Sequence, residues 1–250
     1  MVFDKFWELI INNYYLIAII ILGLAGIILF AFLPSGKKKI PHFYLPFSIL
    51  VLVVFYELLA TYMVANRVLH EKIHYLLTSD TFKGWNTWVF NVFNYQLSKI
   101  LFLLLIRENL NNKTRKTWVL YLIGILIIGS LGLTFSEIEK IHEPQPVIYF
   151  LGNIFLIIAS GLFFIDLISE DYFLSLNPVE FLPFWYITLI LFQSVLTLLS
   201  DVAFEYLAFN QVEIYYLFNY TSMILYFLMS IAFIMLFSLG RNTLLKNTEI

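Results

Sequence analysis

The sequence predicts an all-α polytopic membrane protein, a seven-transmembrane-helix bundle that forms a single integral membrane domain over residues 1–250. The first observation is composition: 61% of the residues are hydrophobic and 19% aromatic, and the mean hydropathy is +0.85. The second is that only 13% are charged, against about 25% in soluble domains. The third is the presence of seven apolar runs of about 20 residues, the length that a bilayer core requires. Such runs must be helices, because hydrocarbon offers the backbone polar groups no other partner.

The seven predicted spans are bounded by charged residues, proline or asparagine. In chain order they cover residues 14–33, 46–65, 85–106, 118–135, 147–168, 182–204 and 215–239. The first span is expected to be a retained helix, because its apolar stretch exceeds the roughly 7–15 residues of a signal peptide. Trp85, Trp118 and Trp185 fall at predicted helix ends, where amphipathic rings prefer the headgroup layer. These aromatic residues support the spans independently of hydropathy.

The distribution of lysine and arginine predicts the orientation of the chain. One side of the predicted membrane carries nine of these residues: Lys37, Lys38, Lys39, Arg107, Lys113, Arg115, Lys116, Arg241 and Lys246. The other side carries five: Lys5, Arg67, Lys72, Lys83 and Lys140. Because basic residues are enriched in cytoplasmic loops, we expect the N-terminus outside and the C-terminus in the cytoplasm.

An internal repeat relates the first three spans to the last three. The second and sixth spans begin with the same tripeptide, and the third and seventh share another: Leu45-Pro46-Phe47 with Leu182-Pro183-Phe184, and Phe93-Asn94-Tyr95 with Phe218-Asn219-Tyr220. The matches occur in the same order, which predicts parallel repeats in a 3+1+3 plan, residues 12–110 and 146–240 joined by a linker helix at 118–135. The alternative is that these tripeptide matches arise by chance, because the chain is rich in Phe and Leu.

Glu57 and Lys99 are the charged residues that lie deepest in the predicted spans. A charge at the bilayer centre costs about 2.5–3.5 kcal/mol, so such residues are candidates for function. Their depths differ by about 6 Å on adjacent antiparallel helices, which predicts that they pair. With Asn94, Gln193 and Asn219 they form a predicted ligand or ion pocket, although interhelical hydrogen bonding is the favoured role of these three amides. Three acidic residues near span ends are expected to be interfacial: Asp166, Asp201 and Glu205.

Residues 70–74 match the H-E-x-x-H pattern of zinc metalloproteases. In that pattern two histidines one helical turn apart, here His70 and His74, bind zinc, and the glutamate, here Glu71, activates water. The segment is expected to extend the second helix on the outer side, and His142 of the next outer loop is a candidate third ligand. A solvated helix extension is the favoured interpretation, with a zinc site or an outer-facing protease as minor alternatives.

No other catalytic chemistry emerges, so the chain is not expected to be an enzyme, and zinc is the only cofactor considered. The absence of cysteine excludes disulfides, iron–sulfur clusters, thiolate zinc sites and a cysteine nucleophile. There is no Gly-rich phosphate loop and no serine elbow. The net charge of −2 gives no reason to expect a nucleic-acid partner. The lipid bilayer is the expected partner.

Three segments carry a resemblance to a known family. They are Trp85-Asn86 leading through an aromatic helix to a basic loop, the Asn177-Pro178 entry toward Trp185, and the Asn-bearing seventh span. The chain resembles an uncharacterised family of bacterial seven-transmembrane-helix proteins, some encoded near sensor histidine kinases. The resemblance implies a multi-pass protein of the inner (plasma) membrane with a sensory or accessory role. A signalling partner would dock on the basic loop from Arg107 to Lys116.

A small-solute transporter is the alternative function. The 3+1+3 plan with an outside N-terminus resembles the sugar-transporting SWEET proteins in outline. Those proteins have prolines deep in several helices, however, whereas all seven prolines here lie in loops or near helix ends. This departure favours the sensory role, because no helix is predicted to break at mid-membrane.

Overall fold

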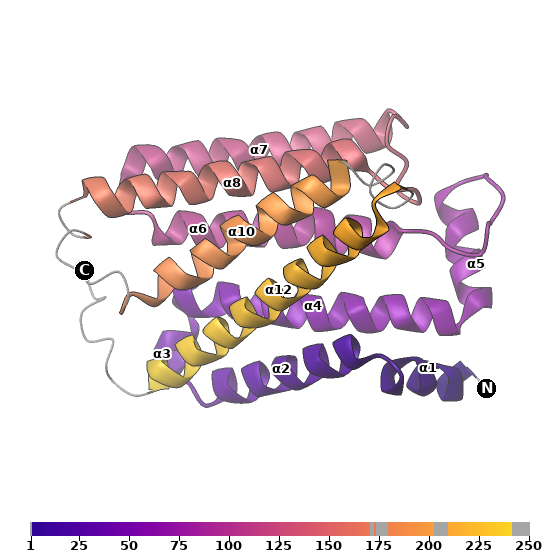
Figure 1. The fold of residues 1–250 in the computed structure, drawn as a ribbon, viewed down its shortest axis with the longest axis horizontal. Coiled ribbons are helices and arrows are strands. Elements are labelled where there is room, and N and C mark those ends of the chain that lie inside the picture. The colour runs from indigo at the N-terminus through magenta and orange to yellow at the C-terminus, as the bar shows by residue number, and fades with distance from the viewer. Residues whose placement is uncertain (1, 171–172, 174–179, 203–209, 242–250) are drawn as a thin grey trace.

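The computed structural model describes residues 2–170, 173, 180–202 and 210–241, and within these ranges the secondary structure is helical (Figure 1). The helices are α1 (Val2–Ile11), α2 (Tyr14–Ala31), α3 (Ser35–Lys38), α4 (Pro41–Ala65), α5 (Arg67–Leu77), the π-helix η1 (Phe90–Ser98), α6 (Lys99–Asn109), α7 (Lys113–Phe135), α8 (Pro146–Ser169), α10 (Leu182–Val202) and α12 (Val212–Arg241). Asn177-Pro178, Glu205 and Lys246 lie outside the described residues.

Within the described residues, six helices are long and apolar enough to cross a membrane: α2, α4, α7, α8, α10 and α12. They coincide with six of the seven predicted spans. The prediction of an all-α protein with several membrane-spanning helices is thereby confirmed. The remaining predicted span, residues 85–106, falls largely on η1 and α6, which follow one another without a gap. Residues Phe90–Ser98 of that segment form a π-helix, which the apolar pattern did not predict.

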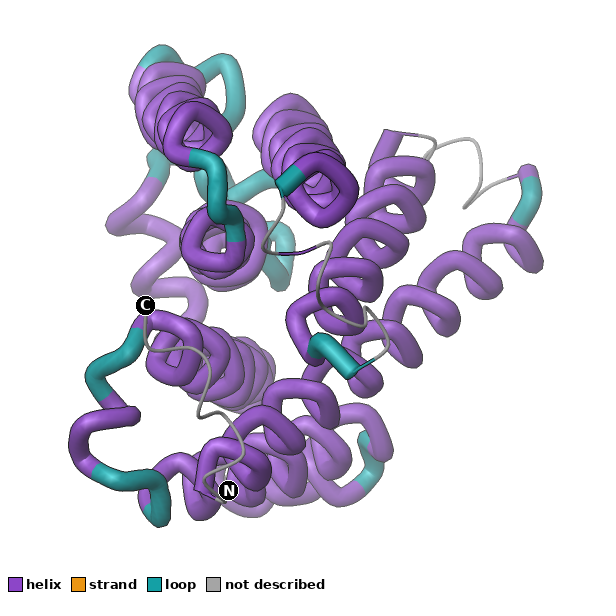
Figure 2. Tube along the Cα trace, turned by 90° about the vertical axis from the view of Figure 1, so that its left-hand side faces the viewer, coloured by secondary structure: helices purple, strands orange, loops and turns teal. Residues whose placement is uncertain are grey.

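The long helices are arranged as a ring. Each helix of the series α2, α4, α6, α8, α10 and α12 packs on the next, and α12 closes the ring by packing on α2. Figure 2 views this arrangement from the end at which α3 lies. Helix α7 stands outside the ring, against α6, α8 and η1. The helices of the two predicted repeats therefore occupy the ring, and the predicted linker helix does not.

Helices α1 and α5 were not among the predicted spans. Helix α1 precedes the first span and is separated from it by Asn13, whose side chain accepts hydrogen bonds from the N–H groups of Tyr15 and Leu16. Helix α5 is a correction, because the H-E-x-x-H segment does not continue α4. Asn66 leaves the helical conformation (φ −106°, ψ 74°), and its side chain caps α5 at Leu69. Asparagine is a preferred residue at such a position.

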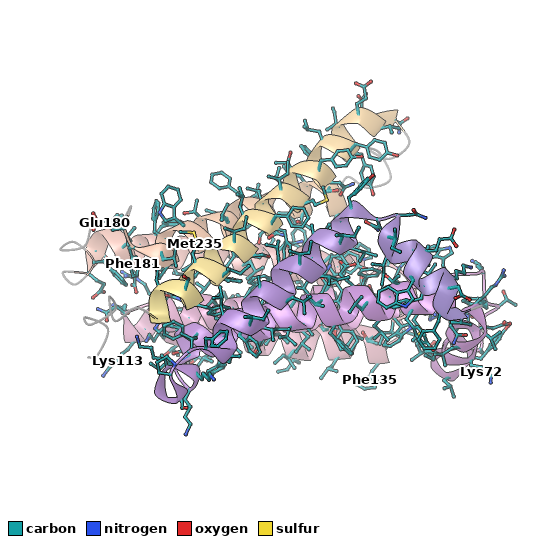
Figure 3. The ribbon with its side chains drawn as sticks, turned by 90° about the horizontal axis from the view of Figure 1, so that it is seen from below. Lys72, Lys113, Phe135, Glu180, Phe181 and Met235 are labelled. Carbon is teal, nitrogen blue, oxygen red and sulfur yellow. The ribbon has the colours of Figure 1, made fainter. Side chains whose placement is uncertain are left out.

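The loops sort into two groups at opposite ends of the bundle. The N-terminus and α5 lie at one end, and α3 and the C-terminal end of α12 lie at the other (Figure 1). Figure 3 shows Lys72 and Lys113 at these two ends. The predicted orientation compares the lysines and arginines of these two groups of loops. We call the two ends of the bundle the α5 end and the α3 end.

Candidate functional site

A cavity of about 360 Å³ lies inside the ring of helices. All six ring helices, together with η1, contribute side chains to its wall. The five predicted pocket residues are among them: Glu57, Lys99, Asn94, Gln193 and Asn219. The structure therefore brings the sequence-predicted set together around one space.

Glu57 and Lys99 do not pair with each other, contrary to the sequence prediction. None of the salt bridges between described residues involves either of them. The Glu57 carboxylate accepts a hydrogen bond of 2.9 Å from the hydroxyl of Tyr15 on α2. Beside it, the hydroxyl of Tyr56 donates to Oδ1 of Asn94 at 3.3 Å. Among the described residues, Glu57 is thus held by one neutral donor, Tyr15, and has no cationic partner.

Lys99 has its partners on α8 and α10. Its Nζ donates to Oδ1 of the fully buried Asn153 at 2.7 Å, and Asn153 donates to Oδ2 of Asp201 at 3.4 Å. Lys99 also interacts electrostatically with Asp201. Gly152 makes this approach possible, since a Cβ there would lie 3.2 Å from Cγ of Lys99. The partner on α8 lies closer than Glu57, which explains why the predicted pair does not form.

Asp201 is the lining residue that sequence reasoning missed. It is the penultimate residue of α10, so it was expected at the interface, but it lines the cavity. Helices α10 and α12 are both inclined relative to α6, α7 and α8 (Figure 1), so the end of α10 does not run parallel to α8. Tyr226 was missed as well: it is 8% exposed and lines the cavity. An aromatic residue in an aromatic-rich span gives no sequence signal for either feature.

The cavity ends about halfway along the bundle. Phe102, Ile190 and Tyr226 line it, and one turn nearer the α3 end the same helices place three side chains that have no exposed surface. They are Ile106, Ile187 and Met229. Close-packed apolar side chains leave no passage for a polar molecule. The polar cavity therefore lies in the half of the bundle nearer α5.

Residues that correspond in the predicted repeat face the same cavity. Gln193 and Ser194 align with Tyr56 and Glu57, and all four line it. Asn219, the counterpart of Asn94, does so too. The packing order is also the same in both halves, with the first helix on the second and the second on the third. The internal repeat itself stays a prediction.

A second cluster lies at the α5 end and differs from the predicted metal set. His70 and His74 are buried on α5, whereas Glu71 is exposed. The His70 ring contacts Phe82 at 5.3 Å, and only His74 reaches His142, with ring centroids 5.2 Å apart. The predicted set of His70, His74 and His142 is therefore not assembled around one point.

An ion pair occupies the rim of this second cluster. Nζ of Lys140 donates to Oδ2 of Asp80 at 2.7 Å. The hydrogen bond from Lys140 lowers the pKa of Asp80 below its usual range, and in return raises the pKa of Lys140. Asp80 therefore stays ionised at neutral pH.

Several residues of the predicted docking loop, residues 107–116 at the α3 end, form contacts within the protein. Arg115 bonds the carboxylate of Asp166 and the hydroxyl of Ser169. Asp166, expected at the interface, has no exposed surface. Its Oδ2 accepts from the backbone N–H groups of Asn111 at 2.6 Å and Asn112 at 3.1 Å. This carboxylate therefore fastens the α6–α7 loop to the end of α8.

Comparison with known proteins does not add to this geometry. No family model matches the chain, and no curated protein or solved structure matches it significantly.

Proposed function

We propose that the chain is a non-enzymatic membrane sensor or accessory protein that receives a small polar ligand from outside in the cavity of the helix ring. The observation that carries the proposal is the form of the cavity. It is polar toward the α5 end, receives side chains from every ring helix, and is closed by apolar packing toward the α3 end. A ligand entering it contacts all six helices and shifts their relative positions, which carries a signal through the helix bundle.

The topology that this function requires has seven spans, with η1 and α6 together as the third. These two elements run continuously from Phe90 to Asn109, close to the roughly 20 residues that a bilayer core needs. The proposed orientation places the α5 end outside and the α3 end in the cytoplasm, and the 3+1+3 plan makes α7 the linker. The exposed Lys113 then belongs to a cytoplasmic docking surface at residues 107–116.

Labelling of single cysteines tests this orientation, because the natural chain contains none. In intact cells a membrane-impermeant maleimide is expected to label Lys72→Cys, and to label Lys113→Cys only after permeabilisation. Both lysines are exposed, so reagent access and not burial decides the result. The reverse pattern would overturn the orientation, and labelling of both from outside would contradict an odd number of spans between them.

The lining favours a small organic cation as the ligand. Glu57 and Asp201 place two carboxylates on the wall against one cation, Lys99. Four tyrosines line the same space: Tyr15, Tyr56, Tyr95 and Tyr226. Tyrosine faces attract cations by about 0.5–2 kcal/mol each, depending on desolvation. A substituted ammonium group beside Glu57 would pair its charge and contact the surrounding rings.

Binding of tetramethylammonium to the purified full-length protein in nanodiscs tests the proposal. We expect the wild type to bind this cation, and Glu57→Gln to weaken binding at least about tenfold, because the substitution removes the uncompensated charge. Glu71→Gln is the matched control, since Glu71 is exposed on α5 outside the cavity, and its affinity should equal that of the wild type. Calorimetric titration provides the measurement. Equal affinity of Glu57→Gln and the wild type would contradict the proposed ligand class.

A small-solute transporter is the second candidate, and the pseudo-symmetric ring favours it. Three-helix units that share a central cavity are a common transporter plan. Uptake of the same cation into proteoliposomes separates the two functions. The sensor predicts binding without accumulation, whereas accumulation that is lost in Glu57→Gln would replace it with the transporter.

A further inference from the structure

The cluster at the α5 end surrounds a cavity of its own, of about 510 Å³, apart from the cavity in the ring. His74, Asp80, His142 and Glu143 are among its lining residues. One ligand atom from each of Asp80, His142 and Glu143 lies within 4.8 Å of the others. Two carboxylates and an imidazole are therefore gathered at a single point, from two loops that are distant in sequence.

We propose that Asp80, His142 and Glu143 bind one Zn²⁺ ion at this end of the protein. Zinc lies about 2.0–2.1 Å from nitrogen and oxygen ligands, so two ligands of a tetrahedral ion are about 3.3 Å apart. Nε2 of His142 is 3.3 Å from Oδ2 of Asp80 and 3.9 Å from Oε1 of Glu143. A small movement of the exposed Glu143 side chain completes the spacing.

The burial of His74 and His142 favours a bound ion at this cluster over a surface network of ion pairs alone. His142 is 7% exposed, and its Nε2 makes no hydrogen bond within the described part of the chain, although Oδ2 of Asp80 lies 3.3 Å away. His74 is 3% exposed, and its Nε2 lies 3.0 Å from the carbonyl oxygen of Asp80. A carbonyl only accepts, so Nε2 of His74 carries the proton and Nδ1 presents a lone pair. That Nδ1 is buried and also without a partner.

The fourth position of the ion explains the unpartnered Nδ1 of His74. Three protein ligands leave a tetrahedral zinc ion one site for water. A zinc-bound water donates hydrogen bonds, and we assign as its acceptor the buried Nδ1 of His74, whose ring centroid lies 5.2 Å from that of His142. His74 accordingly acts as a positioning residue and not as a ligand, which differs from the H-E-x-x-H arrangement.

The loop that carries His142 and Glu143 is held rigidly before any ion binds. Nδ2 of Asn91 on η1 donates to the carbonyl oxygens of Ile141 and Glu143, both at 2.7 Å. The N–H of Thr87 donates to the carbonyl oxygen of His142 at 3.2 Å. Ligands on a fixed backbone lose less freedom on binding and so bind more tightly.

Lys140 competes with the ion for Asp80. Its Nζ bonds the same Oδ2 that faces His142. Removal of this ammonium group frees the carboxylate, so Lys140→Ala is expected to raise the affinity for zinc about threefold. A cluster that served only as an ion-pair network would show no such gain.

Zinc binding to the metal-stripped, full-length protein in nanodiscs tests the site, with a fluorescent zinc indicator as competitor and elemental analysis for stoichiometry. We expect one Zn²⁺ per wild-type chain, a loss of at least about 100-fold in affinity for His142→Ala and Glu143→Gln, and about tenfold for His74→Ala. His70→Ala and Glu71→Gln are the matched controls and should bind like the wild type. Thermal melting of each variant shows that it is folded. A wild type that binds no zinc at micromolar concentration, or binding that depends on His70, would overturn the proposal.

Discussion

Replacement of Asp166 by alanine is expected to destabilise the protein by about 3–5 kcal/mol, the effect of removing one partner of a buried ion pair. The carboxylate has no exposed surface and bonds both Arg115 and two backbone N–H groups of the α6–α7 loop. Without it, the guanidinium group loses its close partner and the loop loses its attachment to α8. Unfolding by SDS in mixed micelles, followed by circular dichroism, measures the change.

Glu170→Ala is the control for the Asp166 substitution. Glu170 lies 3.6 Å from the same arginine, but its side chain is 26% exposed. A partly exposed pair of this kind contributes about 0.2–1 kcal/mol. A loss for Asp166→Ala as small as that for Glu170→Ala would show that the buried junction does not hold this end of the bundle together.

Asn91→Ala is expected to destabilise the α5 end by about 2–4 kcal/mol. Asn91 is fully buried and its side chain bonds four groups: the carbonyls of Ile141 and Glu143, and the hydroxyls of Thr87 and Tyr149. Each buried polar group left without a partner costs about 1–3 kcal/mol, and a share of these costs is recovered by water at the loop. Unfolding measured in the same mixed micelles gives the value.

A second measurement separates structural and functional effects of Asn91. Because Asn91 positions the loop of His142 and Glu143, its removal should also weaken zinc binding by about 10–100-fold. Thr87→Val is the control, since it leaves both loop carbonyls bonded to Asn91 and should cost only about 1 kcal/mol. Equal stability of Asn91→Ala and Thr87→Val would show that the loop is held by other contacts.

The choice of pocket residues was largely predictable, but their partners were not. Burial depth follows from position along a helix, which rises 1.5 Å per residue, so Glu57 and Lys99 could be identified as deep charges. Their pairing depended on which faces of their helices meet, and 61% hydrophobic composition leaves too few polar residues to define a face. Lys99 bonds Asn153 because α8, and not α4, presents the closer acceptor.

In the H-E-x-x-H segment, a local sequence pattern did not predict which residues come together in the fold. Spacing alone places His70 and His74 on one face, and both are indeed buried. The helix break at Asn66 sets the direction of α5, and this direction carries His74 but not His70 to His142. The acidic partners come from Asp80 and Glu143, on loops that no helical period describes.

The sequence by itself determined the membrane class and the positions of six apolar helices, because hydropathy is a local property of the chain. Only the tertiary structure decided the ring order, the entry of Asp201 into the cavity, the burial of Asp166 and the grouping of His142 with two carboxylates. These features depend on the tilt of each helix and its rotation about its own axis. Both are set by side-chain packing between segments far apart in the sequence.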